Sequence, residues 1–142
     1  MSTASGTEIE PTENESRPIT AADETSLGIS ENAAGALSYL LGFVTGLIFY
    51  FVEDKNEFVR FHAIQSTIVF GGLFALGIAL NVAGVALASI PVLGLVLALA
   101  LGLISLLLGP VALILWIVLM FKAYKGERFA LPVVGTYAER HI

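Results

Sequence analysis

Hydrophobic residues dominate the chain after about residue 33, and charged residues interrupt them at only a few places. Residues 61–121 contain no Asp, Glu, Lys or Arg. A helix needs about 20 mainly apolar residues to cross a bilayer, so this stretch is long enough for two or three spans. Ser89, Ile90 and Pro91 form its best internal break. The pattern therefore predicts two long helices over residues 63–89 and 92–121, joined by a tight turn.

A separate apolar segment precedes this stretch. Residues 33–52 carry no charge, and twenty helical residues would cover about 30 Å, the thickness of the hydrocarbon layer. Ser30, followed by Glu31 and Asn32, is typical of a helix start. The expected fold is thus an all-α integral membrane protein with about three transmembrane helices in a helical domain over residues 33–142.

A four-span arrangement is the alternative, with turns near residues 81–84 and 102–105. Basic residues flank the uncharged stretch on both sides, and the positive-inside rule places such clusters on the cytoplasmic face. Two spans between the clusters place both on the same side of the membrane, as the rule requires, whereas three spans would place them on opposite sides. We therefore expect a multi-pass cell-membrane protein with its N-terminus outside and its C-terminus cytoplasmic. The basic residues concerned are Lys55, Arg60, Lys122, Lys125 and Arg128.

Residues 1–32 have a different composition, rich in Ser, Thr, Glu, Pro and Ala. Seven of the twelve acidic residues lie in the first 34 positions, with Arg17 as the one base. Such a segment buries too little apolar surface to fold, so we expect a disordered acidic tail. The chain lacks the clustered bases that nucleic acid binding needs. It also has no cysteine, which excludes disulfides and thiolate sites. No cofactor is expected.

Small residues recur at four-residue spacing, which lets helices pack closely in lipid. They are Gly42 and Gly46 in the first apolar segment, and Gly94, Ala98 and Gly102 in the last.

Asn81 is the one strongly polar side chain deep in the uncharged stretch. A buried amide in lipid needs a partner, so an interhelical hydrogen bond is expected. A pore-lining or substrate-binding role is the alternative. No Asp, Glu, Lys or Arg accompanies Asn81 in the middle of the membrane, which argues against an ion-coupled transporter.

The first of two polar motifs is EFVRFHAIQS, residues 57–66. On a helix Phe58 and Phe61 share an apolar face, and His62 and Gln65 share another face. Arg60 is long enough to reach a lipid phosphate or a helix C-terminus. A histidine can act as a base or a switch. The simpler interpretation is that this motif fixes the start of the second span by hydrogen bonding.

The second motif is KAYKGERFALPVVG, residues 122–135. Lys122 and Lys125 suit a helix C-terminus at an anionic membrane surface. Gly126 is placed to end that helix. Glu127 and then Pro132 follow, in a short return segment that could lie back on the interface.

Taken together, FVRFHAIQ (58–65), KAYKGE (122–127) and LPVVG (131–135) resemble small prokaryotic membrane proteins grouped with the Tic-twenty-type component of chloroplast protein import. The resemblance covers about residues 33–139. It implies a multi-span helical protein and a role in protein translocation. The acidic tail departs from that pattern, and the plant protein has four spans.

Three functions remain to be weighed. The first is an accessory or structural protein that binds a partner at the cytoplasmic face. The alternative is a transport or translocation component that acts as an oligomeric channel, because three helices alone enclose no pore. An enzyme is not expected, since catalysis needs a constellation of nucleophile, base or metal. The expected partners are membrane lipid and either a second copy or another membrane protein.

Overall fold

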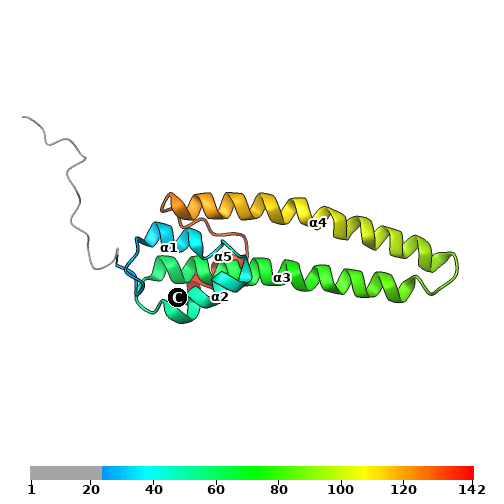
Figure 1. Ribbon diagram of the computed structural model, residues 1–142, viewed down its shortest axis with the longest axis horizontal. Coiled ribbons are helices and arrows are strands. Elements are labelled where there is room, and N and C mark those ends of the chain that lie inside the picture. The colour runs from blue at the N-terminus through cyan, green and yellow to red at the C-terminus, as the bar shows by residue number, and fades with distance from the viewer. Residues whose placement is uncertain (1–23) are drawn as a thin grey trace, which may run out of the picture.

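The computed structural model describes residues 24–142, and within this range every regular element is a helix. The helices are α1 (Glu31–Leu37), α2 (Phe43–Val52), α3 (Glu57–Leu87), α4 (Leu93–Tyr124) and α5 (Val134–Arg140). α3 and α4 form a long antiparallel hairpin, and the three short helices gather at one end of it (Figure 1). We call this the capped end. Most of the predicted acidic tail, residues 1–23, lies outside the described range.

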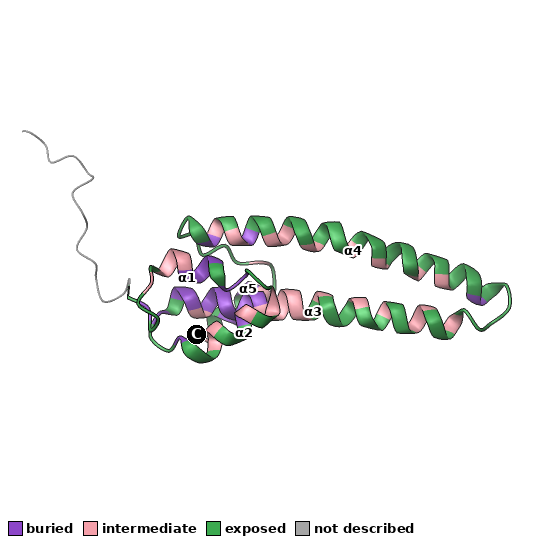
Figure 2. Cartoon of the chain, in the orientation of Figure 1, coloured by how far each residue is buried: buried purple, intermediate pink, exposed green. Residues whose placement is uncertain are grey.

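α3 and α4 are both long and apolar enough to cross a membrane. They have 31 and 32 residues, which correspond to about 46 and 48 Å of helix. Burial divides α3 into two parts (Figure 2): the segment up to Ser66 is mostly buried, and from Thr67 onward the residues are intermediate or exposed. The exposed part covers about 30 Å, the thickness of the hydrocarbon layer. The extra length of α3 therefore belongs to the capped end.

A turn over residues 88–92 joins the two long helices and contains the expected break at residues 89–91. Gly94 packs against the end of α3 so tightly that a Cβ there would collide with the Leu87 carbonyl oxygen. Further along the hairpin, Asn81 donates a hydrogen bond to the Ser105 hydroxyl at 3.0 Å. This bond connects the two helices within the membrane.

The segment expected to form the first span does not form one helix. α1 ends at Leu37 and α2 begins at Phe43, with Gly42 between them at a φ of +61°. The Thr45 hydroxyl stabilises the break, because it donates to the Ser38 carbonyl at 3.1 Å and accepts from the Leu41 N–H at 3.1 Å. The ten residues of α2 cover only about 15 Å. Two helices of the described chain are therefore long enough to span, instead of the three expected.

The chain reverses direction at this break, so α1 and α2 form a short helical hairpin beside the first half of α3 (Figure 1). Ser26, before α1, donates from its N–H to Glu53, after α2, at 2.7 Å. Its hydroxyl also donates to Asp54 at 2.7 Å. Residues before α1 and after α2 thus lie at the same end of the molecule. The segment between them therefore does not cross the membrane. Such a crossing was required for the expected position of the N-terminus on the outside.

Candidate functional site

A cluster of three buried polar side chains lies at the centre of the capped end. Tyr39, His62 and Gln65 are all fully buried. The Tyr39 hydroxyl lies 2.9 Å from His62 Nδ1, and Gln65 Nε2 lies 3.1 Å from the same hydroxyl. Tyr39 comes from the turn between α1 and α2, whereas His62 and Gln65 share one face of α3. The cluster therefore connects the short helical hairpin to the first span.

Backbone partners fix the direction of the Gln65 amide and, for a neutral imidazole, of each hydrogen bond in this cluster. Gln65 Oε1 accepts from the Leu131 N–H at 2.9 Å, so Nε2 is the atom that donates to the Phe129 carbonyl, also at 2.9 Å. Nε2 also donates to the Tyr39 hydroxyl, which leaves that hydroxyl free to donate to His62 Nδ1. His62 Nε2 then donates to the Glu127 carbonyl at 3.1 Å. These directions describe a neutral imidazole with its proton on Nε2.

The return segment, residues 126–133, is held against α3 through its backbone. Its contacts with His62 and Gln65 use the carbonyls of Glu127 and Phe129 and the N–H of Leu131. None of these three contacts uses a side chain of the segment. Most of residues 126–133 are nevertheless exposed. Glu127 pairs with Lys122, Arg128 lies over the Phe61 ring, and Leu131 packs against the core.

Aromatic rings surround His62 within the first turns of α3. Phe58 and Phe61 are buried, with ring centroids 4.5 and 5.1 Å from that of the imidazole. The two phenylalanines do not form a membrane-facing stripe, as an interfacial helix would require. They pack inside the capped end instead, where they exclude water from the cluster.

Arg60 belongs to α3, and its side chain reaches the C-terminus of α2. A helix C-terminus was one of its two expected contacts, and a lipid phosphate was the other. Its guanidinium donates to the Glu53 carbonyl at 2.8 Å and lies 5.0 Å from the centre of the Tyr50 ring. Positive charge at a helix C-terminus is stabilising because carbonyl groups point out of that end. Arg60 therefore closes α2 onto α3.

The residues of the second motif lie at the end of α4. Lys122 forms an exposed ion pair with Glu127 at 2.7 Å, and Lys125 lies over the Phe121 ring. Gly126 follows the helix with a φ of +79°, the left-handed conformation typical of a helix stop. Pro132 is exposed and comes just before α5, where it accepts a bond from the Val134 N–H at 2.8 Å.

Glu53 is a buried carboxylate that the motif analysis missed. Its oxygens accept from the backbone N–H groups of Ser26, Lys55 and Asn56 at 2.7 to 3.0 Å. Burial raises the pKa of the Glu53 carboxyl, but these hydrogen bonds together with one from the Ser26 hydroxyl outweigh it and hold the pKa below its ordinary value. Glu53 thus organises the loop between α2 and α3. Its position in an acidic loop sequence gave no sign of burial.

Two further residues of the core were also missed. Trp116 of α4 donates from its indole N–H to the Tyr39 carbonyl at 2.7 Å, which connects the second span to the same turn. Gly35 of α1 lies so close to α3 that a Cβ there would be 2.8 Å from the Phe58 ring. Tyr39 was missed as well, and the one signal that could have indicated its burial was a tyrosine inside an apolar segment.

The small residues expected at helix contacts divide into two groups. Gly46 packs face to face with α3, where a Cβ would meet the Ala63 carbonyl oxygen at 2.9 Å, and Gly42 faces Phe70. The carbonyl of Ala98 lies 4.0 Å from the Cβ position of Gly84. Gly102 has nothing within 4 Å of its Cβ position in the described chain, so it makes no close contact between α3 and α4, and its predicted packing role stays a prediction.

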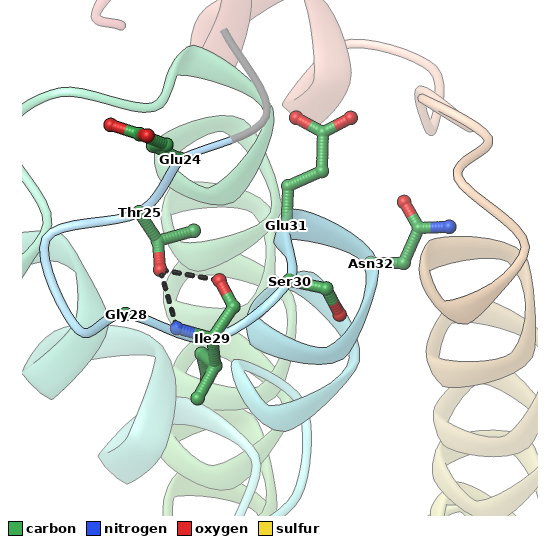
Figure 3. Close-up of a pocket in the computed structure, with 7 residues that line it drawn as sticks. All are labelled: Glu24, Thr25, Gly28, Ile29, Ser30, Glu31 and Asn32. Atoms are coloured by element: carbon green, nitrogen blue, oxygen red, sulfur yellow. Dashed lines mark hydrogen bonds between the residues drawn. The ribbon is translucent and has the colours of Figure 1, made fainter. Parts of the chain in front are cut away.

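A surface hollow of about 650 Å³ lies beside α1 (Figure 3). Thr25 bridges its rim, donating to the Ile29 carbonyl at 2.7 Å and accepting from the Ile29 N–H at 3.2 Å. The Ser30 hydroxyl accepts from the Ala33 N–H and caps α1. These polar groups form hydrogen bonds within the turn before α1 and at the start of α1. We therefore do not assign the hollow as the functional site.

The buried cluster is built to hold elements together. Among residues 24–142, no buried side-chain nitrogen or oxygen lacks a hydrogen-bond partner. Four elements meet at the cluster: the turn after α1, α3, α4 and the return segment. Satisfied polar networks of this kind specify one packing arrangement, because any alternative leaves a buried group unpaired.

Comparison with known proteins decides the family. Residues 23–137 match the family described as the magnetosome magnetite crystal formation protein family. The chain belongs to this family. The matched range contains the whole of α1, α2, α3 and α4, most of α5, and both polar motifs. No solved structure matches the chain.

Relatives of the chain occur in Methanocaldococcus jannaschii and Archaeoglobus fulgidus. A UPF0132 membrane protein of Methanocaldococcus jannaschii is 51% identical over 118 residues, which cover 83% of this chain and 94% of that protein. A UPF0132 membrane protein of Archaeoglobus fulgidus is 47% identical over 114 residues, covering 80% and 97%. The membrane class is therefore established.

The resemblance to the Tic-twenty-type import component is wrong. The matching family is the magnetosome one, and the relatives carry the UPF0132 membrane-protein name. The two motifs do flank the long helices in the order that suggested the resemblance. Their structural task, to bind α3 and the return segment to each other, is not specific to a translocation machine.

Proposed function

We propose that this family member is a non-enzymatic accessory membrane protein that presents the return segment to a partner at the membrane surface. The observation that carries the proposal is the backbone attachment of the return segment. His62 and Gln65 bind it through main-chain groups only. Phe129 and Arg128 remain exposed, although Lys122 lies over the Phe129 ring and Arg128 over the Phe61 ring. A recognition surface that is already ordered loses less entropy on binding than a flexible one.

The distribution of charge supports a partner on the cytoplasmic side. Every Lys, Arg, Asp and Glu in residues 24–142 lies outside the stretch 61–121, and hence at or near the capped end of the hairpin (Figure 1). The turn over residues 88–92 carries none. The positive-inside rule then favours a cytoplasmic capped end with both α1 and the C-terminus on that side. This orientation replaces the expected outside N-terminus as our proposal.

The family's description concerns the formation of a mineral crystal, and a membrane anchor that positions another component is compatible with it. An oligomeric channel remains the second candidate from sequence. The hairpin offers it little support, because α3 and α4 alone enclose no path and carry no charge between residues 61 and 121. Conductance of the purified protein in planar bilayers would support the channel.

Photo-crosslinking in native membranes tests whether the return segment binds a partner protein. A benzophenone amino acid replaces Phe129 in the return segment or, in a matched control, Leu106, which is 71% exposed on α4. We expect a defined protein adduct from Phe129 and lipid adducts from Leu106. Identical adduct patterns at the two positions would contradict the proposal.

A further inference from the structure

An apolar groove of about 630 Å³ lies between α3 and α4 where the hairpin crosses the lipid. Its lining residue Phe70 packs edge-on against Tyr39, but the groove contains none of the polar side chains of the buried cluster and no residue of the return segment. Asn81 and Ser105 are its two polar side chains, one from each helix. Its other lining residues include the aromatic side chains Phe43, Phe70 and Phe74 and the small residues Gly77, Gly109 and Ala112.

The two polar side chains leave one acceptor and one donor unused. Asn81 Nδ2 donates to the Gly77 carbonyl at 2.7 Å and to the Ser105 hydroxyl oxygen at 3.0 Å. Within residues 24–142, no group donates to Asn81 Oδ1, and the Ser105 hydroxyl donates to no acceptor. Asn81 is exposed on the isolated chain, but at this depth its surroundings are hydrocarbon. An unpaired polar group there costs about 1–3 kcal/mol.

We propose that this groove is the contact surface between two copies of the chain. The Ser105 hydroxyl of each copy donates to Oδ1 of Asn81 of the partner subunit, and a two-fold axis along the membrane normal relates the copies. Such an interface must be self-complementary, and an unused donor beside an unused acceptor satisfies that requirement. The axis keeps both copies of the Asn81–Ser105 pair at the same depth.

Other occupants of the groove fit the chemistry less well. A lipid acyl chain fills apolar space but has neither a donor for Asn81 nor an acceptor for Ser105. A second copy supplies both groups at the required depth. The small side chains of Gly77, Gly109 and Ala112 also allow the close helix approach on which association in lipid depends. The dimer would be a bundle of four long helices with both capped ends on one side.

Disulfide crosslinking tests the interface directly, because the chain contains no cysteine and each introduced one is unique. Ile78 lines the groove and is 50% exposed, whereas Leu106 is 71% exposed and lies outside the set of groove residues. We expect Ile78→Cys to form an oxidised dimer in liposomes and Leu106→Cys to remain monomeric at the same protein-to-lipid ratio. Equal crosslinking at the two positions would overturn the interface, as would its absence at both.

A second comparison addresses the hydrogen bonds in the Ile78→Cys background. Ser105→Ala removes the donor, and we expect the dimer to weaken about tenfold, the effect of losing two interhelical hydrogen bonds. Ser105→Thr keeps the hydroxyl and should crosslink like the parent. Circular dichroism of each variant confirms that the helices remain formed. Unchanged crosslinking in Ser105→Ala would refute the proposed pairing. Neither result depends on whether the return segment binds a partner.

Discussion

The His62 imidazole accepts a hydrogen bond from the Tyr39 hydroxyl, with 2.9 Å between Nδ1 and the oxygen. This one bond joins the turn after α1 to the first turns of α3. The opposite ring nitrogen reaches the Glu127 carbonyl, 65 residues further along the chain. His62 therefore bonds two segments that are far apart in the sequence, and Gln65, three residues along the same helix, bonds the same two segments.

Replacing His62 with Ala should destabilise the protein by about 2–4 kcal/mol. The change leaves the Tyr39 hydroxyl and the Glu127 carbonyl without their partners and opens a cavity between two phenylalanine rings. Unfolding by SDS titration in mixed micelles measures the loss. Trp116 is the only tryptophan, and its bond to the Tyr39 carbonyl makes its fluorescence sensitive to the cluster.

His141→Ala provides the matched control for this variant. His141 is exposed, and its ring bonds the Tyr137 carbonyl at 2.8 Å and stacks on the Tyr137 ring, one turn earlier on α5. Its loss should change the free energy of unfolding by less than about 0.5 kcal/mol. A His62→Ala protein as stable as the His141→Ala protein would show that the cluster does not hold the capped end together.

Gly46→Ala tests the close packing of α2 on α3. The added Cβ would meet the Ala63 carbonyl oxygen at 2.9 Å and the Thr67 hydroxyl at 2.8 Å. Because one contact is with backbone, the helices must separate, which should cost about 1–3 kcal/mol. Gly72→Ala, with nothing within 4 Å of its Cβ position, is the control. We expect it to be neutral or stabilising by up to about 1 kcal/mol, so equal melting temperatures would contradict this packing.

The sequence predicted the hairpin of long helices better than it predicted the capped end. Absence of charge and a break near Pro91 are properties of the chain itself, and they were enough to place α3 and α4. Residues 33–52 met the same length and hydropathy criteria, yet they form two short helices. What decides the difference is local: Gly42 adopts a left-handed conformation, and the Thr45 hydroxyl bonds the backbone on both sides of the break.

The candidate site shows a similar division. Spacing placed His62 and Gln65 on one helix face, and the structure has them there. Their partners Tyr39, Glu127 and Phe129 come from 23 to 65 residues away along the chain. Contacts over such distances depend on how α1 and α2 reverse direction, and the sequence analysis did not recognise Gly42 and Thr45 as the residues that make this break.

Acidic pH should destabilise the capped end through Glu53. A carboxyl whose pKa is lowered by folding contributes stability above its unfolded pKa and loses it as the pH falls through the lowered folded value. The ordinary value is 4.5, so the loss should begin as the pH drops below about 4.5. Asp54 and Glu127 also have lowered pKa values, through hydrogen bonds from Ser26 and Lys122. Both add to the effect.

Glu53→Gln separates the contribution of Glu53 from the others. The amide keeps the shape but accepts fewer hydrogen bonds, so the variant should be less stable at neutral pH and lose less stability on acidification. Thermal melting in detergent between pH 7 and pH 3.5 provides the comparison. If both proteins lose stability equally over this range, Glu53 is not the group that responds.

Site-directed labelling tests the two-span arrangement. Single cysteines at Leu27, Lys125 and Ser89 report on the start of the described chain, the end of α4 and the turn between the spans. In oriented vesicles, a membrane-impermeant maleimide should label Leu27→Cys and Lys125→Cys from one side and Ser89→Cys from the other. Labelling of Leu27→Cys and Lys125→Cys from opposite sides would restore a third crossing and refute the re-entrant α1–α2 hairpin.

Gln65→Leu should release the return segment while leaving the hairpin in place. The change removes the bonds to the Phe129 carbonyl and the Leu131 N–H, which are Gln65's two attachments to that segment. Local opening exposes the backbone to protease, so trypsin should cleave after Arg128 several times faster than in the parent protein.

Ser66→Ala is the control, because it removes a neighbouring buried bond, to the Gly42 carbonyl, without contacting the segment. Ser66→Ala should lower the melting temperature yet keep the cleavage site protected. If Gln65→Leu is cleaved no faster than Ser66→Ala, the segment is held by its own packing and the basis of the proposed recognition surface is lost.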